Sequence, residues 1–166
     1  EAAVTLRDRL ETVLAADGMH VEALSVTAET ARLRLRNNRF DQEPQAIGRA
    51  ARAMTRTLPA SVETFEIEPV SRGLPAARVT FKRSDIEALE NAPDGSNRLL
   101  AHTTIGETTD SVAEGTVWGE GLYPKFRWSL GPNALFSWFD PDQPVRADLN
   151  ALLAAEYDLL PGLTFS

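Results

Sequence analysis

The sequence predicts an α+β fold in which a helix-plus-β-hairpin unit occurs twice, in the order αββαββ, followed by a β-rich C-terminal segment. Apolar residues recur at helical spacing before each of two pairs of alternating segments. In addition, residues 21–26 (VEALSV) match residues 62–67 (VETFEI), and each follows a predicted helix and opens a predicted hairpin. Two such units side by side would form a four-stranded sheet with helices on one face, which is a two-layer architecture.

The first unit contains a helix and two strands. The helix is predicted between Thr5, its expected N-cap, and Gly18, which is expected to end it. Strands are predicted over residues 21–27 and 31–36. The second strand alternates apolar residues with arginines, which is typical of a strand with one buried and one solvated face. These arginines are Arg32, Arg34 and Arg36.

The second unit repeats this order. A helix is predicted after Asp41, with Pro44 in its first turn and an apolar stripe along one face. Strands are predicted around residues 65–67 and 77–81. The segment 84–87 (SDIE) has the pattern of a capping box, so a short helix is expected to follow the last strand.

Charge and aromatic residues divide the chain. Residues 1–92 carry 13 Lys or Arg and 14 Asp or Glu, whereas residues 93–166 carry 4 and 10, a net charge of −6. The turn-forming segment 91–97 separates the two regions. We therefore predict an αββαββ module over 1–92, a linker over 93–121 and a β-strand segment over 122–166.

The strand segment has one ambiguous element. Residues 122–130 alternate apolar and polar side chains, which predicts a strand. Residues 145–160 alternate in the same way, but their Ala and Leu content also fits an amphipathic helix, so periodicity leaves both open.

Composition excludes several classes of site. The chain has no cysteine, so disulfides and thiolate chemistry are excluded. Its net charge of −7 argues against a nucleic-acid partner, and no apolar run approaches the roughly 18 residues of a membrane helix. Neither His20 nor His102 has metal-ligand spacing, so no metal or cofactor is predicted. The chain starts without methionine or a signal-peptide pattern, and we expect it to be part of a longer protein.

Several segments of this sequence resemble the YjbH/GfcD-like proteins of bacterial exopolysaccharide production. The most specific is the tyrosine–proline to glycine–proline stretch. The segments are LYPKFRWSLGP at 122–132, AEYDLLPGL at 155–163, NNRF at 37–40, AIGRAAR at 46–52, RTLP at 56–59 and VTFKRSD at 79–85.

The resemblance implies an outer-membrane β-barrel protein, often lipid-anchored, that acts with polysaccharide export proteins. The module at 1–92 would then lie at the periplasmic face of the outer membrane, and residues from about 122 would be the first barrel strands. The family carries over no catalytic residues. The expected function is a non-catalytic module for docking or polysaccharide guidance, with other export proteins and the polysaccharide itself as partners.

Two groups of residues are candidates for binding. Arginines can hold carboxylates or phosphates bidentately, although cross-strand pairs with glutamates explain the strand arginines equally well. Aromatic residues could stack on sugar rings or lie at a membrane interface, and burial is the alternative. The arginines are Arg32, Arg34, Arg36, Arg49, Arg52 and Arg56, and the aromatic residues are Trp118, Tyr123, Trp128 and Trp138.

Two other functions stay open at this point. One is a glycan-modifying hydrolase, which would use a pair of carboxylates near Trp118. The available residues are Glu107, Asp110, Glu114 and Glu120. The other is a purely structural linker or plug with no ligand.

Overall fold

The computed structural model describes residues 2–71, 73–108, 113, 115–121, 125–138, 145–160 and 163–165. The chain forms two compact units, residues 1–122 and residues 123–166, which we describe separately. Both helices and strands are present, so the α+β class is confirmed.

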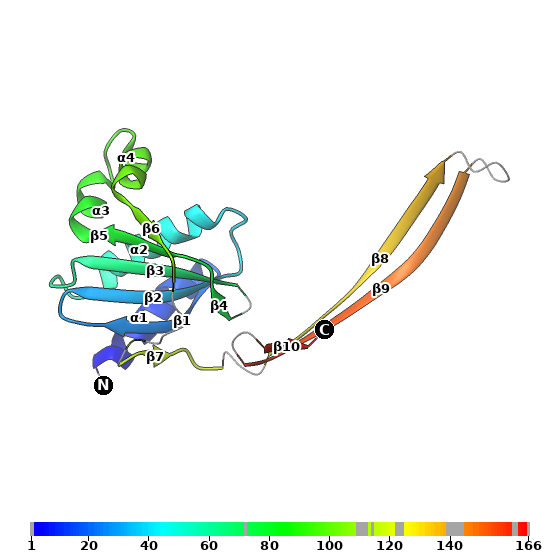
Figure 1. Cartoon of the computed structure of the whole chain (residues 1–166), viewed down its shortest axis with the longest axis horizontal. Coiled ribbons are helices and arrows are strands. Elements are labelled where there is room, and N and C mark those ends of the chain that lie inside the picture. Colours follow the sequence, from blue (N-terminus) through cyan, green and yellow to red (C-terminus); the bar gives the residue numbers. More distant parts are fainter. Residues whose placement is uncertain are drawn as a thin grey trace. The chain divides into compact units, whose positions relative to one another are not determined.

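The first unit contains a mixed sheet with the strand order β6-β5-β3-β2-β1-β7, and the short β4 pairs with β3 at one end (Figure 1). The parallel pairing lies at the centre, between β2 and β3, and the other pairs are antiparallel. The strands are β1 (Met19–Val26), β2 (Thr30–Asn37), β3 (Thr64–Ser71), β4 (Leu74–Pro75), β5 (Arg78–Lys82), β6 (Thr104–Gly106) and β7 (Val117–Trp118). The helices are α1 (Ala2–Ala16), α2 (Glu43–Thr57), α3 (Arg83–Leu89) and α4 (Gly95–His102).

One face of the sheet carries the hydrophobic core. Helices α1 and α2 pack on this face (Figure 1), and their apolar side chains join those of the strands in one cluster. Strand β2 contributes Ala31, Leu33 and Leu35, each fully buried, and β3 contributes Phe65 and Ile67. Because side chains alternate along a strand, this burial sends the polar residues of β2 and β3 to the opposite face.

The structure does not confirm an internal duplication. Strand β1 is the outer strand of the first hairpin, whereas β3 is the inner strand of the second. Val21 lies within β1, but Val62, its expected counterpart, precedes β3. The predicted order αββαββ is present, and both hairpins, β1–β2 and β3–β5, are antiparallel. The crossover through α2 makes β3 run parallel to β2, so the two hairpins are joined by a βαβ connection at the centre of the sheet.

Residues 93–121, expected as a linker, contribute to the first unit. They include α4, β6 and β7, and the two strands pair at opposite edges of the sheet. Strand β6 pairs with β5, and β7 pairs with β1 through Ala23↔Trp118 and Leu24↔Val117.

Two predicted helix caps are wrong. Helix α1 begins at Ala2, so Thr5 lies inside the helix. Helix α3 begins at Arg83 after Lys82 as N-cap, so Ser84 is already helical. The Ser84 hydroxyl instead donates a 2.6 Å hydrogen bond to Oε1 of Glu63, which offers a charged acceptor just before β3.

The second unit is a three-stranded antiparallel sheet of order β10-β9-β8. Its strands are β8 (Lys125–Trp138), β9 (Val145–Leu160) and β10 (Leu163–Phe165). Residues 145–160, whose periodicity fits a strand or a helix, therefore form a strand. Strands β8 and β9 stay in register from Lys125↔Asp158 to Trp138↔Val145, without an interruption.

Candidate functional site

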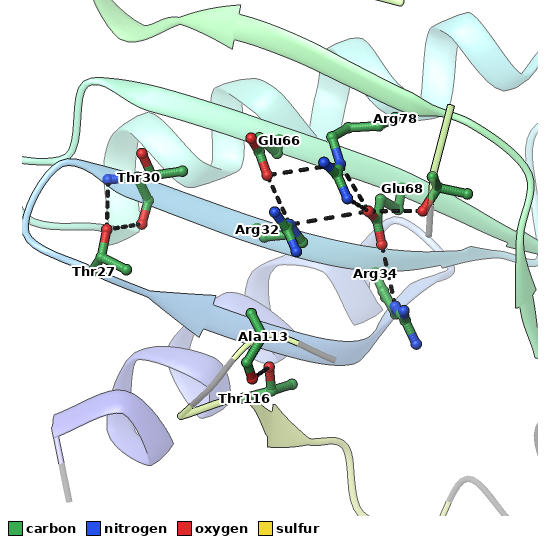
Figure 2. Close-up of polar contacts among 10 residues, drawn as sticks. Thr27, Thr30, Arg32, Arg34, Glu66, Glu68, Arg78, Ala113 and Thr116 are labelled. Atoms are coloured by element: carbon green, nitrogen blue, oxygen red, sulfur yellow. Dashed lines mark hydrogen bonds and ion pairs between the residues drawn. The ribbon is translucent and has the colours of Figure 1, made fainter. Parts of the chain in front are cut away.

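The face of the sheet opposite the helices carries rows of paired charges. Because β2 and β3 are parallel and in register, Arg32 lies beside Glu66 and Arg34 beside Glu68. Cross-strand neighbours of opposite charge attract each other, and here they form ion pairs (Figure 2). We call the polar and aromatic residues of this face the charged face. Its members treated below are Glu22, Arg32, Arg34, Arg36, Glu66, Glu68, Arg78, Thr108 and Trp118.

Glu68 is the centre of the charged face, and its side chain is only 1% exposed. Its Oε1 accepts hydrogen bonds from Nε and Nη2 of Arg78 at 2.9 and 2.8 Å. Thr108 donates to the same oxygen at 2.9 Å, and Nε of Arg34 donates to Oε2 at 3.2 Å. Figure 2 shows the guanidinium groups of Arg32, Arg34 and Arg78 converging on Glu66 and Glu68.

These contacts keep the Glu68 carboxylate charged. Burial by itself would raise the pKa of Glu68, but hydrogen bonds from Arg78, Thr108 and Arg34, with the charge of Arg78, lower the pKa below its ordinary value. Both oxygens are occupied by protein donors. Glu68 is therefore suited to hold the arginines in place and unsuited to exchange a proton with a substrate.

The neighbouring arginines of β2 are held in a similar way. Nε of Arg32 donates to Glu66 at 2.7 Å, and Nε of Arg36 donates to Glu22 at 2.6 Å. Glu22 lies at an irregularity in the pairing of β1 with β2, and its side chain is 1% exposed. The sequence predicts cross-strand pairs between the arginines and the glutamates of the neighbouring predicted strand, Glu66 and Glu68, and both pairs are present. The irregularity that places Glu22 beside Arg36 has no simple sequence signal.

Trp118 reaches the charged face from the edge strand β7. It pairs with Ala23 of β1, and Ala23 in turn pairs with Arg34 of β2. The residue between them in the sheet, Ala23, is small, and the Arg34 guanidinium lies over the Trp118 ring, 5.7 Å from its centroid. Trp118 remains 40% exposed.

The arginines predicted on α2 form a separate group. Arg49 lies 3.3 Å from Asp17 and over the ring of Phe40, and Arg56 lies 3.1 Å from Glu90. Arg52 is exposed. Because α2 covers the core side of the sheet, these three arginines are not brought together with the arginines of β2.

The predicted aromatic residues are also divided. Trp118 belongs to the first unit, and Trp128 lies in β8 of the second, 65% exposed. Tyr123 lies outside the described residues, as does the side chain of Trp138.

Two of the four carboxylates proposed for hydrolysis lie among the described residues. Glu107 is exposed, and Glu120 is exposed with Nη2 of Arg7 3.6 Å away. The other two carboxylates proposed for hydrolysis, Asp110 and Glu114, lie outside the described residues. No cluster of metal-binding side chains occurs among the residues that the structure describes.

Sequence analysis missed three residues that shape this unit. Arg78 and Thr108 complete the shell of Glu68 from β5 and from the segment after β6. Arg83 donates to the carbonyl oxygens of Pro59 and Val62 at 2.6 and 3.3 Å, and so caps the chain that leaves α2. The alternation of β5 placed Arg78 on the polar face, but only the fold shows which carboxylate it meets.

The family model YjbH, described as "Exopolysaccharide biosynthesis protein YbjH", matches residues 1–166. Comparisons with curated proteins and with solved structures found no match. Among the described residues, no helix has the length and apolar character needed to cross a membrane. The family match covers the whole chain and agrees with the resemblance carried by its sequence motifs. The chain therefore belongs to the YjbH family of exopolysaccharide biosynthesis proteins.

Proposed function

We propose that this chain is a non-catalytic, periplasmic module of an outer-membrane protein, and that it guides or docks an exopolysaccharide during export. Membership of the family supports the link to exopolysaccharide production. The single structural observation that carries the membrane part of the proposal is the two-faced β8–β9 hairpin of the second unit.

One face of this hairpin is apolar and open to its surroundings. Phe126, Trp128 and Leu130 of β8 are each more than 60% exposed, as are Leu149 and Leu153 of β9. A soluble domain buries such residues, because each buried side chain stabilises the fold by about 1.5 to 3 kcal/mol. A partner surface of lipid chains would cover them.

The opposite face of the hairpin is polar near its base. Arg127 lies 3.0 Å from Glu156 and 2.9 Å from Asp158. The register places Phe126 and Trp138 twelve residues apart on one strand. At about 3.3 Å per residue and a tilt of about 40°, this length spans roughly 30 Å, the thickness of the hydrocarbon core. This match supports strands that belong to a barrel wall.

The charged face supports a binding role over a catalytic one. The Glu68 carboxylate has protein donors on both oxygens. A general acid or base needs an oxygen within reach of substrate and a pKa near the working pH, whereas the pKa of Glu68 is lowered.

The test compares export and cleavage in the host of the parent protein. Cells that lack residues 2–121 of this chain, but keep the remainder of the parent, are assayed for secreted and cell-retained polysaccharide. We expect the total to be unchanged and the secreted share to fall. In parallel, the purified chain is incubated with the host polysaccharide, and no new reducing ends are expected.

Unchanged secretion would contradict the guiding role. New reducing ends would contradict the non-catalytic assignment and would direct attention to the carboxylates near Trp118. The control deletion removes α4 alone, residues 95–102, a segment that contains none of the residues of the charged face.

A further inference from the structure

The charged face contains a straight row of side chains across four strands. Glu68 of β3 lies beside Arg34 of β2, Arg34 beside Ala23 of β1, and Ala23 beside Trp118 of β7. Glu68 holds one side of the Arg34 guanidinium, and the Trp118 ring lies at the other side. This row places a largely buried guanidinium beside an aromatic ring that is 40% exposed.

The Arg34 side chain is only 10% exposed, so its terminal edge is the part that a ligand could reach. Its only described hydrogen bond leaves from Nε, toward Glu68. The terminal atoms Nη1 and Nη2 have no hydrogen-bond partner among the described residues. Neither of these two atoms is fully buried, so each keeps some contact with solvent. Arg32, two residues earlier on the same face, likewise donates from Nε to Glu66 and leaves its terminal nitrogens without a described partner.

Such an edge matches a carboxylate. Two parallel N–H groups of a guanidinium donate to the two oxygens of a carboxylate, which is the strongest common geometry for this pair. Because the glutamates already fix each guanidinium through Nε, little conformational freedom is lost when the outer edge binds. The apolar face of a sugar ring packs well against an indole.

We propose that Arg34 and Trp118 form a binding site for a carboxylated sugar of an anionic polysaccharide. The carboxylate accepts hydrogen bonds from Nη1 and Nη2 of Arg34, and the pyranose ring packs against the exposed part of Trp118. Arg32 supplies a second guanidinium about 7 Å along the strand, for a neighbouring acidic group of the same polymer. This inference rests on the proposed function, since it names the class of polysaccharide that the module would guide.

The charge of this face fits an anion. Its described residues include four arginines against three glutamates, although the whole chain carries a net charge of −7. A neutral polysaccharide would gain only the contact with Trp118. The site is therefore expected to discriminate by charge as well as by ring shape.

The experiment measures binding of a galacturonic acid hexamer to the full chain in non-ionic detergent, by isothermal titration calorimetry. The matched ligand is the same hexamer with every carboxylate methyl-esterified, which keeps the rings and removes the charges. Two variants change the site: Arg34→Met removes the guanidinium donors, and Trp118→Leu removes the indole ring. The control variant, Arg98→Met, removes an exposed charge of α4.

We expect the acidic hexamer to bind and the ester to bind at least tenfold more weakly. Arg34→Met is expected to raise Kd by about tenfold or more, since a charge-assisted hydrogen bond is worth that much. Trp118→Leu is expected to raise Kd by about tenfold, since the sugar ring loses the flat indole face against which it packs. Arg98→Met is expected to leave Kd within about twofold, and added salt to weaken binding of the acidic hexamer.

Equal binding of acid and ester, no binding of either, or an equal loss with Arg98→Met would each overturn the site. If Arg34→Met unfolds the sheet, Arg34→Lys replaces it. Lysine keeps a positive charge for Glu68 but lacks the planar guanidinium with its two parallel N–H donors, so the same rise in Kd is expected. A reduced secreted share in the deletion experiment together with no binding here would retain the guiding role and remove this site.

Discussion

Replacing Glu68 by glutamine should strongly destabilise the first unit. The substitution keeps the size of the side chain and one carbonyl acceptor, but it removes the negative charge that Arg34 and Arg78 face. The amide NH₂ of glutamine is a donor, so it would face the N–H and O–H groups that now donate to Glu68 and leave some of them without an acceptor. Removing one partner of a buried ion pair costs about 3 to 5 kcal/mol, because the opposite charge is left uncompensated. We expect the lower end, about 3 kcal/mol, since both arginines stay partly accessible to water.

Glu66→Gln is the matched control on the same strand and face. Glu66 is more exposed than Glu68, at 18% against 1%, and its one hydrogen bond to a described residue comes from Arg32. Its second charged contact, with Nε of Arg78, is long at 3.8 Å. One charge-assisted hydrogen bond that water partly replaces is worth about 1 kcal/mol. The difference between the two glutamine variants therefore measures what burial and the additional donors contribute at Glu68.

The same substitution predicts a pH dependence. The pKa of Glu68 is lowered in the folded chain, so its contribution is fully present above the unfolded pKa of about 4.3. The contribution is lost as the pH falls through the lower, folded pKa, because protonation then discharges the carboxylate. The free-energy gap between the wild type and Glu68→Gln should thus be constant from pH 7 to pH 5 and shrink below pH 4.

Urea unfolding followed by fluorescence can measure this gap in the first unit alone. With Trp128 and Trp138 replaced by phenylalanine, Trp118 is the only tryptophan, and it reports on the sheet edge beside Arg34. A loss for Glu68→Gln that equals the loss for Glu66→Gln would refute the reasoning. A gap that stays unchanged down to pH 2 would do the same.

Three further substitutions test the local structure, each by the midpoint of urea unfolding. Gly48→Ala should stabilise α2 by about 0.5 to 1 kcal/mol, since the new Cβ would meet only Arg52, at an ordinary 3.9 Å; a loss would mean a clash in the helix. Gly18→Ala should destabilise by at least about 1 kcal/mol, because φ is +72° and the Cβ would lie 2.9 Å from Cβ of Arg39. Arg83→Met should cost about 2 kcal/mol, because the carbonyls after α2 lose their donor; a neutral result would mean that water replaces it.

The core of the first unit could be predicted from sequence because it depends on local periodicity. The alternation in β2 sets which residues are buried, and α2 has the apolar spacing of a helix packed on one face. The order of the strands could not be obtained in this way. The match between residues 21–26 and 62–67 suggested equivalent hairpins, but strand order depends on the path through α2, which apolar spacing does not encode.

The segment between the two predicted domains shows another limit of local patterns. Turn-forming residues at 91–97 indicated a linker, yet the chain after them adds β6 to one edge of the sheet and β7 to the other. Strands of two or three residues have too few side chains for alternation to be recognised. Their pairing depends on backbone hydrogen bonds to an exposed edge, which any sequence without proline can supply.

The candidate site depends on that unrecognised pairing. Arg34 and Trp118 were both candidates, but they are far apart in sequence, and nothing in either segment indicates that they meet. They meet because β7 pairs with β1 at Ala23, the residue opposite Arg34, and because alanine is small enough to leave the two side chains in contact. A larger side chain at position 23 would stand between the guanidinium and the ring and push them apart. The site is therefore a property of the strand register across β2, β1 and β7, and Ala23 is as necessary to its geometry as the two residues that would contact the sugar.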